Sequence, residues 1–174
     1  MKITLKSGNV ANISRSLDRL GLRESADQLV VIGGAALAVF GIKPLRETDL
    51  DIAVTSELMS QLEADGQWEL SLRQATMSGV AHEREVVGYN GLTITNGDVT
   101  AIKMPLDDLY RVSSAQLIKK SITPDDSAYR FIGPARVLDW KLSLVNSPYY
   151  SGPKAKHLED ATRISSFLTK ISNT

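Results

Sequence analysis

Two aspartates separated by a single residue, Asp49 and Asp51, have the spacing expected of metal ligands. They open the segment 49–54, whose alternating character favours a β-strand. Because successive side chains of a strand point to opposite faces, both carboxylates project from the same face. A hard divalent cation removes their mutual repulsion, prefers oxygen ligands and usually takes substrate phosphates as well. The pair therefore predicts a site for Mg²⁺ or Mn²⁺ beside a phosphorylated substrate.

The glycine pair Gly33-Gly34 suits the binding of that phosphate. It follows the apolar run 28–32, which predicts a strand buried on both faces. It precedes residues 35–40, which are apolar all round and predict a short buried helix. Glycines let a phosphate approach the backbone where a helix begins and its N–H groups point outward. The spacing differs from the dinucleotide-binding GxGxxG motif, and the Walker A pattern is absent.

A lysine in the C-terminal half occupies an unusual position. The segment 134–145 has helical periodicity, with its apolar residues on one broad arc. The members of that arc are Val137, Leu138, Trp140, Leu142, Leu144 and Val145. Lys141 falls near the middle of the arc, where an ammonium needs a carboxylate or a bound phosphate as its partner.

The last predicted helix, residues 154–171, places His157 and Asp160 on its inward face, together with Leu158 and Ile164. Two interpretations follow. Lys141 and Asp160 form a buried ion pair that joins the two helices, or they line a substrate cleft. The interpretations are compatible, because an ion pair in a cleft can face the substrate. His157 is interpreted as a core histidine with satisfied hydrogen bonds.

The segment 33–54 resembles the signature of the nucleotidyltransferase superfamily, the DNA polymerase beta-like fold, and is most similar to its AbiEii-type branch. That branch carries GGxAL, a spacer with Arg and Ser/Thr, and then Asp-hydrophobic-Asp. The matching residues here are Gly33, Gly34, Ala36, Leu37, Arg46, Thr48, Asp49, Leu50 and Asp51. The resemblance implies that the glycine turn, Arg46 and Thr48 bind a nucleoside triphosphate (NTP), and that the two aspartates bind the metal. An acceptor hydroxyl then attacks the α-phosphorus, and pyrophosphate leaves.

The resemblance extends to the C-terminal helices. The branch has a helix with a lysine, which matches Lys141, and then K-D-x-x-D, which matches Lys156 and Asp160 in the run KHLED. His157 departs from this pattern. The resemblance implies that Lys141 and Lys156 contact the triphosphate and that Asp160 orients Lys141 or helps to deprotonate the acceptor. Many members carry a third carboxylate on a neighbouring strand. Its candidates here are Glu83, Glu85 and Asp98, of which Asp98 lies in a turn motif, NGD.

Three functions stay open. The first is an NTP-dependent transferase acting as a toxin of a toxin–antitoxin or phage-defence system, with tRNA as acceptor and an antitoxin protein as partner. The resemblance alone implies that role. A basic path for RNA could be formed by Lys119, Lys120, Arg130, Arg136, Lys154 and Lys156, and a solvated surface explains these residues equally well. The second is a small-molecule nucleotidyltransferase of the aminoglycoside type. The third is a degenerate, non-catalytic nucleotide-binding module.

The order of the strands and helices that must position these residues predicts a fold of the α/β (α+β) class. We expect a mixed sheet flanked by helices. We expect residues 1–174 to form one nucleotidyltransferase-like domain, with a core at about 26–105 and a helical portion at about 106–174. A short strand is predicted at residues 1–5, and a helix that begins near Asn12 or Ser14 and ends near Gly21. Residues 55–66 predict a helix, and 68–104 a β-rich region with turns near Gly79, Gly91 and Gly97.

Composition narrows the function classes. The chain has no cysteine, which excludes disulfides, thiolate metal sites and cysteine nucleophiles. Its 20 basic and 20 acidic residues argue against a polycationic nucleic-acid coat. Residues 1–100 are net acidic and 101–174 net basic, which chance and solvated helix faces explain on charge alone. The same asymmetry also suits a cleft with metal ligands on one wall and phosphate binders on the other. The longest apolar run, residues 29–42, contains three glycines and is too short to span a membrane, so we expect a cytoplasmic protein.

Overall fold

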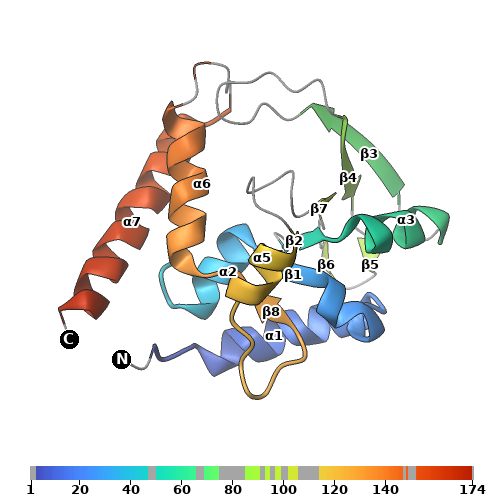
Figure 1. The fold of residues 1–174 in the computed structure, drawn as a ribbon, viewed down its shortest axis with the longest axis horizontal. Coiled ribbons are helices and arrows are strands. Elements are labelled where there is room, and N and C mark those ends of the chain that lie inside the picture. The colour runs from blue at the N-terminus through green and yellow to red at the C-terminus, as the bar shows by residue number, and fades with distance from the viewer. Residues whose placement is uncertain are drawn as a thin grey trace.

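A computed structural model describes residues 3–46, 50–65, 69–74, 85–90, 93–94, 97–98, 102–105, 114–146, 148 and 152–173. The fold is α+β with a mixed sheet flanked by helices, as predicted (Figure 1). In chain order the elements are α1 (Ser7–Arg19), the 3₁₀ helix η1 (Arg23–Gln28), β1 (Leu29–Ile32), α2 (Gly33–Val39), β2 (Asp51–Val54), α3 (Ser56–Ala64), β3 (Glu69–Gln74), β4 (Glu85–Asn90), β5 (Thr93–Ile94), β6 (Gly97–Asp98), β7 (Ile102–Pro105), α5 (Ser114–Lys120), β8 (Arg130–Phe131), α6 (Pro134–Asn146) and α7 (Lys154–Ser172). Within the described part, the main sheet has six strands in the order β3-β4-β7-β2-β1-β8.

The centre of the sheet is the antiparallel pair of β1 and β2. Ile32, the last residue of β1, lies opposite Asp51, the first residue of β2. All four residues of β1 are buried, which confirms the predicted doubly covered strand. The alternation predicted for β2 is wrong, because Ile52, Ala53 and Val54 are all buried. This strand lies between β1 and β7 in the sheet, and both of its faces are covered after Asp51.

The predicted buried helix after β1 is present as α2, which begins at Gly33 itself. Helix α1 packs against it, and the side-chain amide of Asn9 donates a hydrogen bond to the carbonyl of Ala38 at 2.8 Å. Two expectations for the N-terminal region are wrong. Residues 3–6 form no strand, and α1 begins at Ser7, several residues before the predicted cap. The end of α1 is as predicted, because Gly21 follows it with a φ of +72°.

The region after β2 agrees with the prediction where the structure describes it. Thr55 caps α3, and its hydroxyl accepts a hydrogen bond from the Leu58 amide at 3.2 Å. Five short strands follow between residues 69 and 105. The predicted turns at Gly79 and Gly91 lie outside the described residues. The antiparallel pairing of Ile94 with Gly97 agrees with the turn predicted near Gly97, although Asp98 itself lies in strand β6. That strand pairs with β5 in a separate two-stranded sheet.

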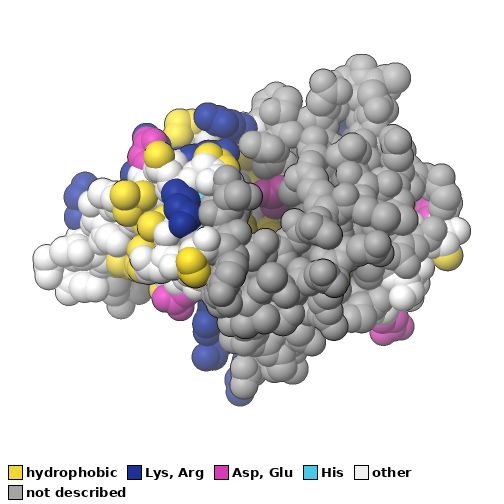
Figure 2. Space-filling view, turned by 90° about the horizontal axis from the view of Figure 1, so that it is seen from above, with side chains coloured by type: hydrophobic (Ala, Val, Ile, Leu, Met, Phe, Trp, Pro, Cys, Tyr) yellow, Lys and Arg dark blue, Asp and Glu magenta, His cyan; other side chains and the backbone are white. Residues whose placement is uncertain are grey.

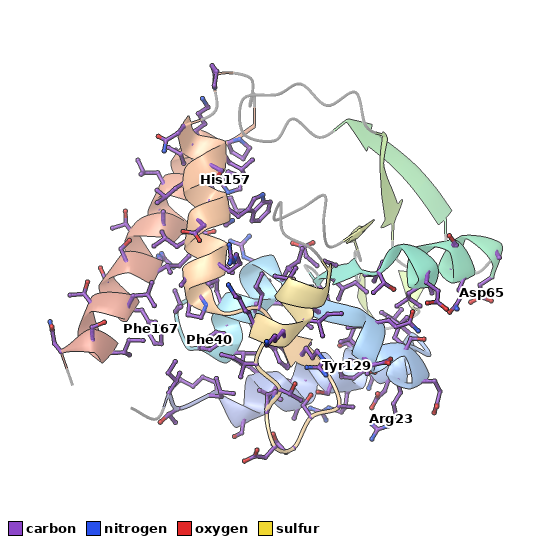
Figure 3. The ribbon with its side chains drawn as sticks, in the orientation of Figure 1. Arg23, Phe40, Asp65, Tyr129, His157 and Phe167 are labelled. Atoms are coloured by element: carbon purple, nitrogen blue, oxygen red, sulfur yellow. The ribbon has the colours of Figure 1, made fainter. Side chains whose placement is uncertain are left out.

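The C-terminal portion is mainly helical, and Pro134 begins α6 as predicted. It also supplies β8, which pairs in parallel with β1, so the core and the helical portion share one sheet. Helices α6 and α7 lie side by side at one end of the molecule, and α6 contacts α2 (Figure 1). Phe167 of α7 contacts Phe40, the residue after α2, with ring centroids 6.4 Å apart (Figure 3). The inward placement of Leu142 and Leu158 is wrong, since both are exposed. Among the described helices, none is both long and apolar enough to cross a membrane.

Candidate functional site

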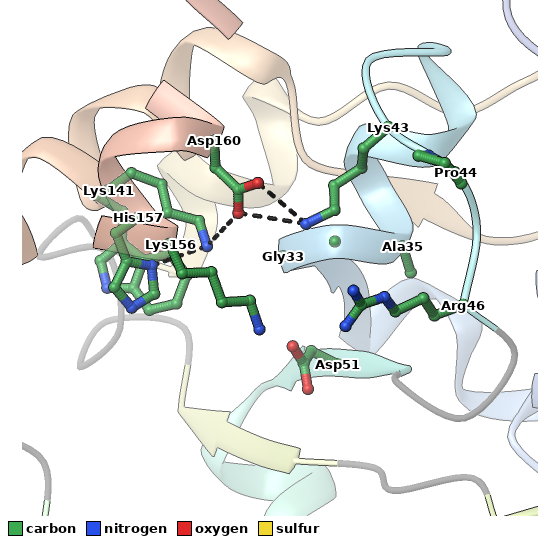
Figure 4. Close-up of a pocket in the computed structure, with 12 residues that line it drawn as sticks. Gly33, Ala35, Lys43, Pro44, Arg46, Asp51, Lys141, Lys156, His157 and Asp160 are labelled. Carbon is green, nitrogen blue, oxygen red and sulfur yellow. Dashed lines mark hydrogen bonds and ion pairs between the residues drawn. The ribbon is translucent and has the colours of Figure 1, made fainter. Parts of the chain in front are cut away.

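A pocket of about 130 Å³ lies between the β1–α2 junction and the α6–α7 pair. Its described lining residues are Gly33, Gly34, Ala35, Lys43, Pro44, Arg46, Asp51, Trp140, Lys141, Lys156, His157 and Asp160 (Figure 4). Seen from above, Lys and Arg side chains gather over the end of the molecule that carries α6 and α7, and an acidic side chain is visible in the hollow beside them (Figure 2). The pocket therefore joins two parts of the chain that lie far apart in the sequence.

The floor of the pocket is formed where β1 ends and β2 begins. The pairing of Ile32 with Asp51 places the next residue, Gly33, directly beside the Asp51 carboxylate. A Cβ atom on Gly33 would lie 2.8 Å from Oδ2 of Asp51, and the φ of Gly33 is +61°. Side chains rarely adopt this φ, and the aspartate leaves no room for one. Glycine at position 33 is therefore what allows Asp51 to lie against the start of α2.

The opposite wall carries the buried ion pair anticipated for Lys141 and Asp160. The Lys141 ammonium lies 3.0 Å from Oδ2 of Asp160, and these side chains are only 7% and 6% exposed. Burial lowers the pKa of Lys141 even though the charge of Asp160 opposes that effect. Burial alone would raise the pKa of Asp160, but the hydrogen bonds and charges of Lys141 and Lys43 bring it below its usual value. The predicted ion pair between α6 and α7 is confirmed, and the pair also lines the pocket.

His157 is the second polar partner of Lys141. Its Nδ1 lies 3.0 Å from the Lys141 ammonium. An ammonium has only protons to offer, so Nδ1 accepts and the imidazole carries its own proton on Nε2. Burial, followed by the charge of Lys141, lowers the pKa of His157 to about 4. The prediction of a buried histidine with a satisfied ring nitrogen is confirmed, and this histidine also lines the pocket.

Three further cations face the pocket. Lys43 follows α2, and its ammonium lies 3.1 Å from Oδ1 of Asp160. Arg46 and Lys156 are exposed, and Figure 4 shows their charged groups directed toward the space above Asp51. The described lining thus holds four cations, including Lys141, and two carboxylates. Such an excess of positive charge attracts anions.

Apart from the candidates for the third carboxylate, the structure brings together every predicted site residue that it describes. These are Gly33, Gly34, Arg46, Asp51, Lys141, Lys156 and Asp160. Thr48 and Asp49 lie outside the described residues. Sequence reasoning missed Lys43 and Trp140 as lining residues. Trp140 was assigned to the apolar arc of α6, and Lys43 has no spacing or neighbour in the sequence that indicates its role.

The register of the sheet bears on the third carboxylate. The residues beside Asp51 on the neighbouring strands are Ile32 and Ile102, and Gly88 follows beyond Ile102. Glu85 pairs with Gln74 at the far end of β4, and Asp98 belongs to the separate β5–β6 sheet. Glu83 lies outside the described residues. Among the described residues, no group of three or more metal-ligating side chains is present.

Comparison with known proteins gives no family assignment. No family model matches the chain, and no curated protein matches its sequence.

Proposed function

We propose that this protein is a metal-dependent nucleotidyltransferase, which transfers a nucleoside monophosphate from an NTP to an acceptor hydroxyl and releases pyrophosphate. One observation carries the proposal. Residues within 33–51 and 141–160 match two separate parts of a nucleotidyltransferase pattern. Those described residues to which the pattern gives a binding or catalytic role line a single pocket: Gly33, Gly34, Arg46, Asp51, Lys141, Lys156 and Asp160. Unrelated surface residues have no reason to converge in this way. The branch assignment, AbiEii-type, rests on the motif resemblance.

The charges of the pocket suit the phosphates of an NTP. Lys141 is buried and fixed by Asp160, whereas Arg46 and Lys156 are exposed and free to adjust to a ligand. Because α2 has only seven residues, the cationic side chains contribute more to phosphate binding than the helix end does. The pocket, at about 130 Å³, is smaller than typical small-molecule sites of roughly 300–1,000 Å³. It fits the phosphate chain, with the sugar and base extending beyond it.

Asp51 fits the role of metal ligand. Mg²⁺ is commonly held by one or two carboxylates together with substrate phosphates, so Asp51 and the predicted ligand Asp49 form a sufficient protein contribution. When bound, Mg²⁺ or Mn²⁺ neutralises charge on the phosphates. The residues of this chain position the reactants. Asp51 would hold the metal at the floor of the pocket. Lys141 orients the phosphate chain, and Asp160 holds Lys141 in place.

The acceptor is proposed to be RNA, such as tRNA, in a toxin–antitoxin or phage-defence system with an antitoxin protein as partner. Exposed and partly exposed cations, of which Lys156 lines the pocket, support an RNA path. Lys154 and Lys156 lie in the first turn of α7, and Arg136 lies in the first turn of α6. Lys119, Lys120 and Arg130 lie in α5 and β8. The motif resemblance is what favours RNA over an aminoglycoside-type acceptor.

One observation favours a second candidate, a nucleotide-binding module without transfer activity. The positions level with Asp51 on the adjacent strands are both isoleucines, so neither supplies a third carboxylate there. Such a module would bind NTP and leave it intact.

The proposal is tested by incubating the protein with each α-³²P-labelled NTP, total RNA, and Mg²⁺ or Mn²⁺. Asp51→Asn keeps the size of the side chain and removes its charge, so transfer is expected to fall by about 100-fold or more. Asp65→Asn is the matched control, because Asp65 is an exposed carboxylate at the end of α3, well away from His157 in Figure 3.

Label on RNA that depends on Asp51 establishes the RNA acceptor. Label on an added aminoglycoside instead moves the acceptor to small molecules. NTP binding without transfer to any acceptor identifies the binding module, and the absence of both binding and transfer rejects the proposal.

A further inference from the structure

Lys43 has no assigned role in the proposed function, yet it is built into the pocket. It lies four residues beyond the end of α2, after a turn in which Gly41 adopts a φ of +72°. Its ammonium lies 3.1 Å from Oδ1 and 3.3 Å from Oδ2 of Asp160, which is 117 residues later in the chain. The side chain is only 14% exposed. A solubilising surface lysine would be neither buried nor paired in this way.

The position of the ammonium is not favoured by the nearby backbone. A Cβ atom on Gly34 would lie 3.7 Å from Nζ of Lys43, so the ammonium rests against the first turn of α2. The N–H groups of a first helical turn carry partial positive charge and repel a cation. Asp160 is therefore what holds Lys43 at this place.

Asp160 holds two ammonium groups at once. Lys43 and Lys141 reach it from opposite sides, and both ammoniums border the space above Asp51 (Figure 4). One carboxylate between two ammoniums leaves a buried group of three residues with a net charge of +1. Each ammonium has three N–H donors, and Lys141 gives one of its three to His157. The single carboxylate cannot accept all of the others. Donors are left for an anionic ligand in the pocket.

We propose that Lys43 and Lys141, held by Asp160, form a two-ammonium clamp for the pyrophosphate part of the nucleotide. This inference rests on the proposed function and adds Lys43 as a phosphate-binding residue. Asp51 lies at the floor, where it is proposed to hold the metal, whereas the clamp attracts the phosphates on the opposite wall. The triphosphate is thereby oriented with its outer phosphates toward Lys43 and Lys141.

The clamp is tested by calorimetric titration of the full chain with inorganic pyrophosphate. Lys43→Met keeps the length of the aliphatic chain and removes the charge, and we expect affinity to fall about 10-fold, as for the loss of one charge-assisted contact. Lys43→Arg retains the charge and is expected to stay within about 3-fold of the wild type. Lys170→Met is the control for net charge, because Lys170 is exposed and lies ten residues beyond Asp160 on α7, about 15 Å along the helix.

Thermal midpoints separate binding from folding. If Lys43→Met alone loses affinity for pyrophosphate and its thermal midpoint is unchanged, the result supports the clamp. If Lys43→Met and Lys43→Arg lose affinity for pyrophosphate equally and both thermal midpoints fall, Lys43 has a structural role and the clamp is overturned. Unchanged pyrophosphate binding in Lys43→Met overturns the clamp and leaves the proposed function standing. If the wild type binds neither pyrophosphate nor any NTP, both proposals fail.

Discussion

At the scale of single residues, the charge of the pocket depends on ionised side chains that are buried. Removing one member of a buried ion pair usually costs more than the pair contributes, because the remaining charge has no partner. Asp160 has two lysine partners, so either lysine can be replaced without leaving Asp160 unpaired. This makes substitutions of Lys43 and Lys141 interpretable as tests of binding.

His157 gives the protein a specific sensitivity to acid. Its pKa in the folded chain is about 4, against an ordinary value of 6.5, so the unfolded chain takes up the proton first as the pH falls. Stability is therefore lost below about pH 6.5, and the loss levels off near pH 4. Between pH 7 and pH 5 this amounts to about 2 kcal/mol. Urea denaturation at the two pH values measures it.

His157→Gln is the comparison for this prediction. Glutamine offers Lys141 an oxygen acceptor and does not titrate, so the variant should lose about 2 kcal/mol less than the wild type over the same interval. Equal losses in the two proteins would show that other groups cause the acid sensitivity.

Single residues also show how far sequence reasoning reaches. Lys141 was identifiable because an ammonium within an apolar arc demands a partner, and the inward face of the next helix offered Asp160. Lys43 was not identifiable, because its contact with Asp160 depends on how α7 is placed against the loop after α2. Local periodicity carries no information about such a long-range contact.

At the scale of elements, the junction of β1 and α2 is the most constrained part of the site. Gly33→Ala is expected to destabilise the protein by about 1–3 kcal/mol, because of the positive φ and the contact with Asp51. The displaced Asp51 carboxylate is also expected to lower affinity for Mg²⁺–NTP. Chemical denaturation and nucleotide titration measure the two effects.

Gly21→Ala is a matched control for that junction. Gly21 has a similar φ of +72°, and a Cβ atom there meets nothing within 4 Å. The control should therefore lose stability through backbone strain and keep its nucleotide affinity. A Gly33→Ala variant that binds nucleotide as the wild type does would contradict the proposed dependence of Asp51 on Gly33.

Elements with a strong local signal were predictable, and short ones were not. The buried run of β1, the Thr55 cap and the proline at the start of α6 each act through neighbouring residues. Strand β8 has two residues, too few for any periodicity, and exists through its pairing with Val30 and Val31. The exposure of Leu158 was also unpredictable, since its position on the helix allowed either outcome.

At the scale of the whole molecule, ligand binding should be coupled to the packing of the C-terminal helices. The pocket is lined by the β1–α2 junction and by α6 and α7 together. A ligand that contacts both sides stabilises only the state in which they are joined. Pyrophosphate or NTP is therefore expected to slow amide hydrogen exchange in α6 and α7, for those amides that exchange only when these helices separate from the β1–α2 junction. At a ligand concentration of 100 times the Kd, the expected slowing is about 100-fold.

Residues in α1 serve as the internal reference for that measurement, because α1 lines no part of the pocket. Protection that rises in α1 but not in α6 and α7 would show that the ligand binds elsewhere.

The 117 residues between Lys43 and Asp160 also set an order of events during synthesis. At roughly 5–20 residues per second, Lys43 is made on the order of ten seconds before its partner. For most of that interval the growing chain has the glycine turn and Asp51 but lacks the complete wall formed by Lys141, His157 and Asp160. A chain that has not yet reached Asp160 therefore cannot hold a nucleotide as the folded chain is proposed to do.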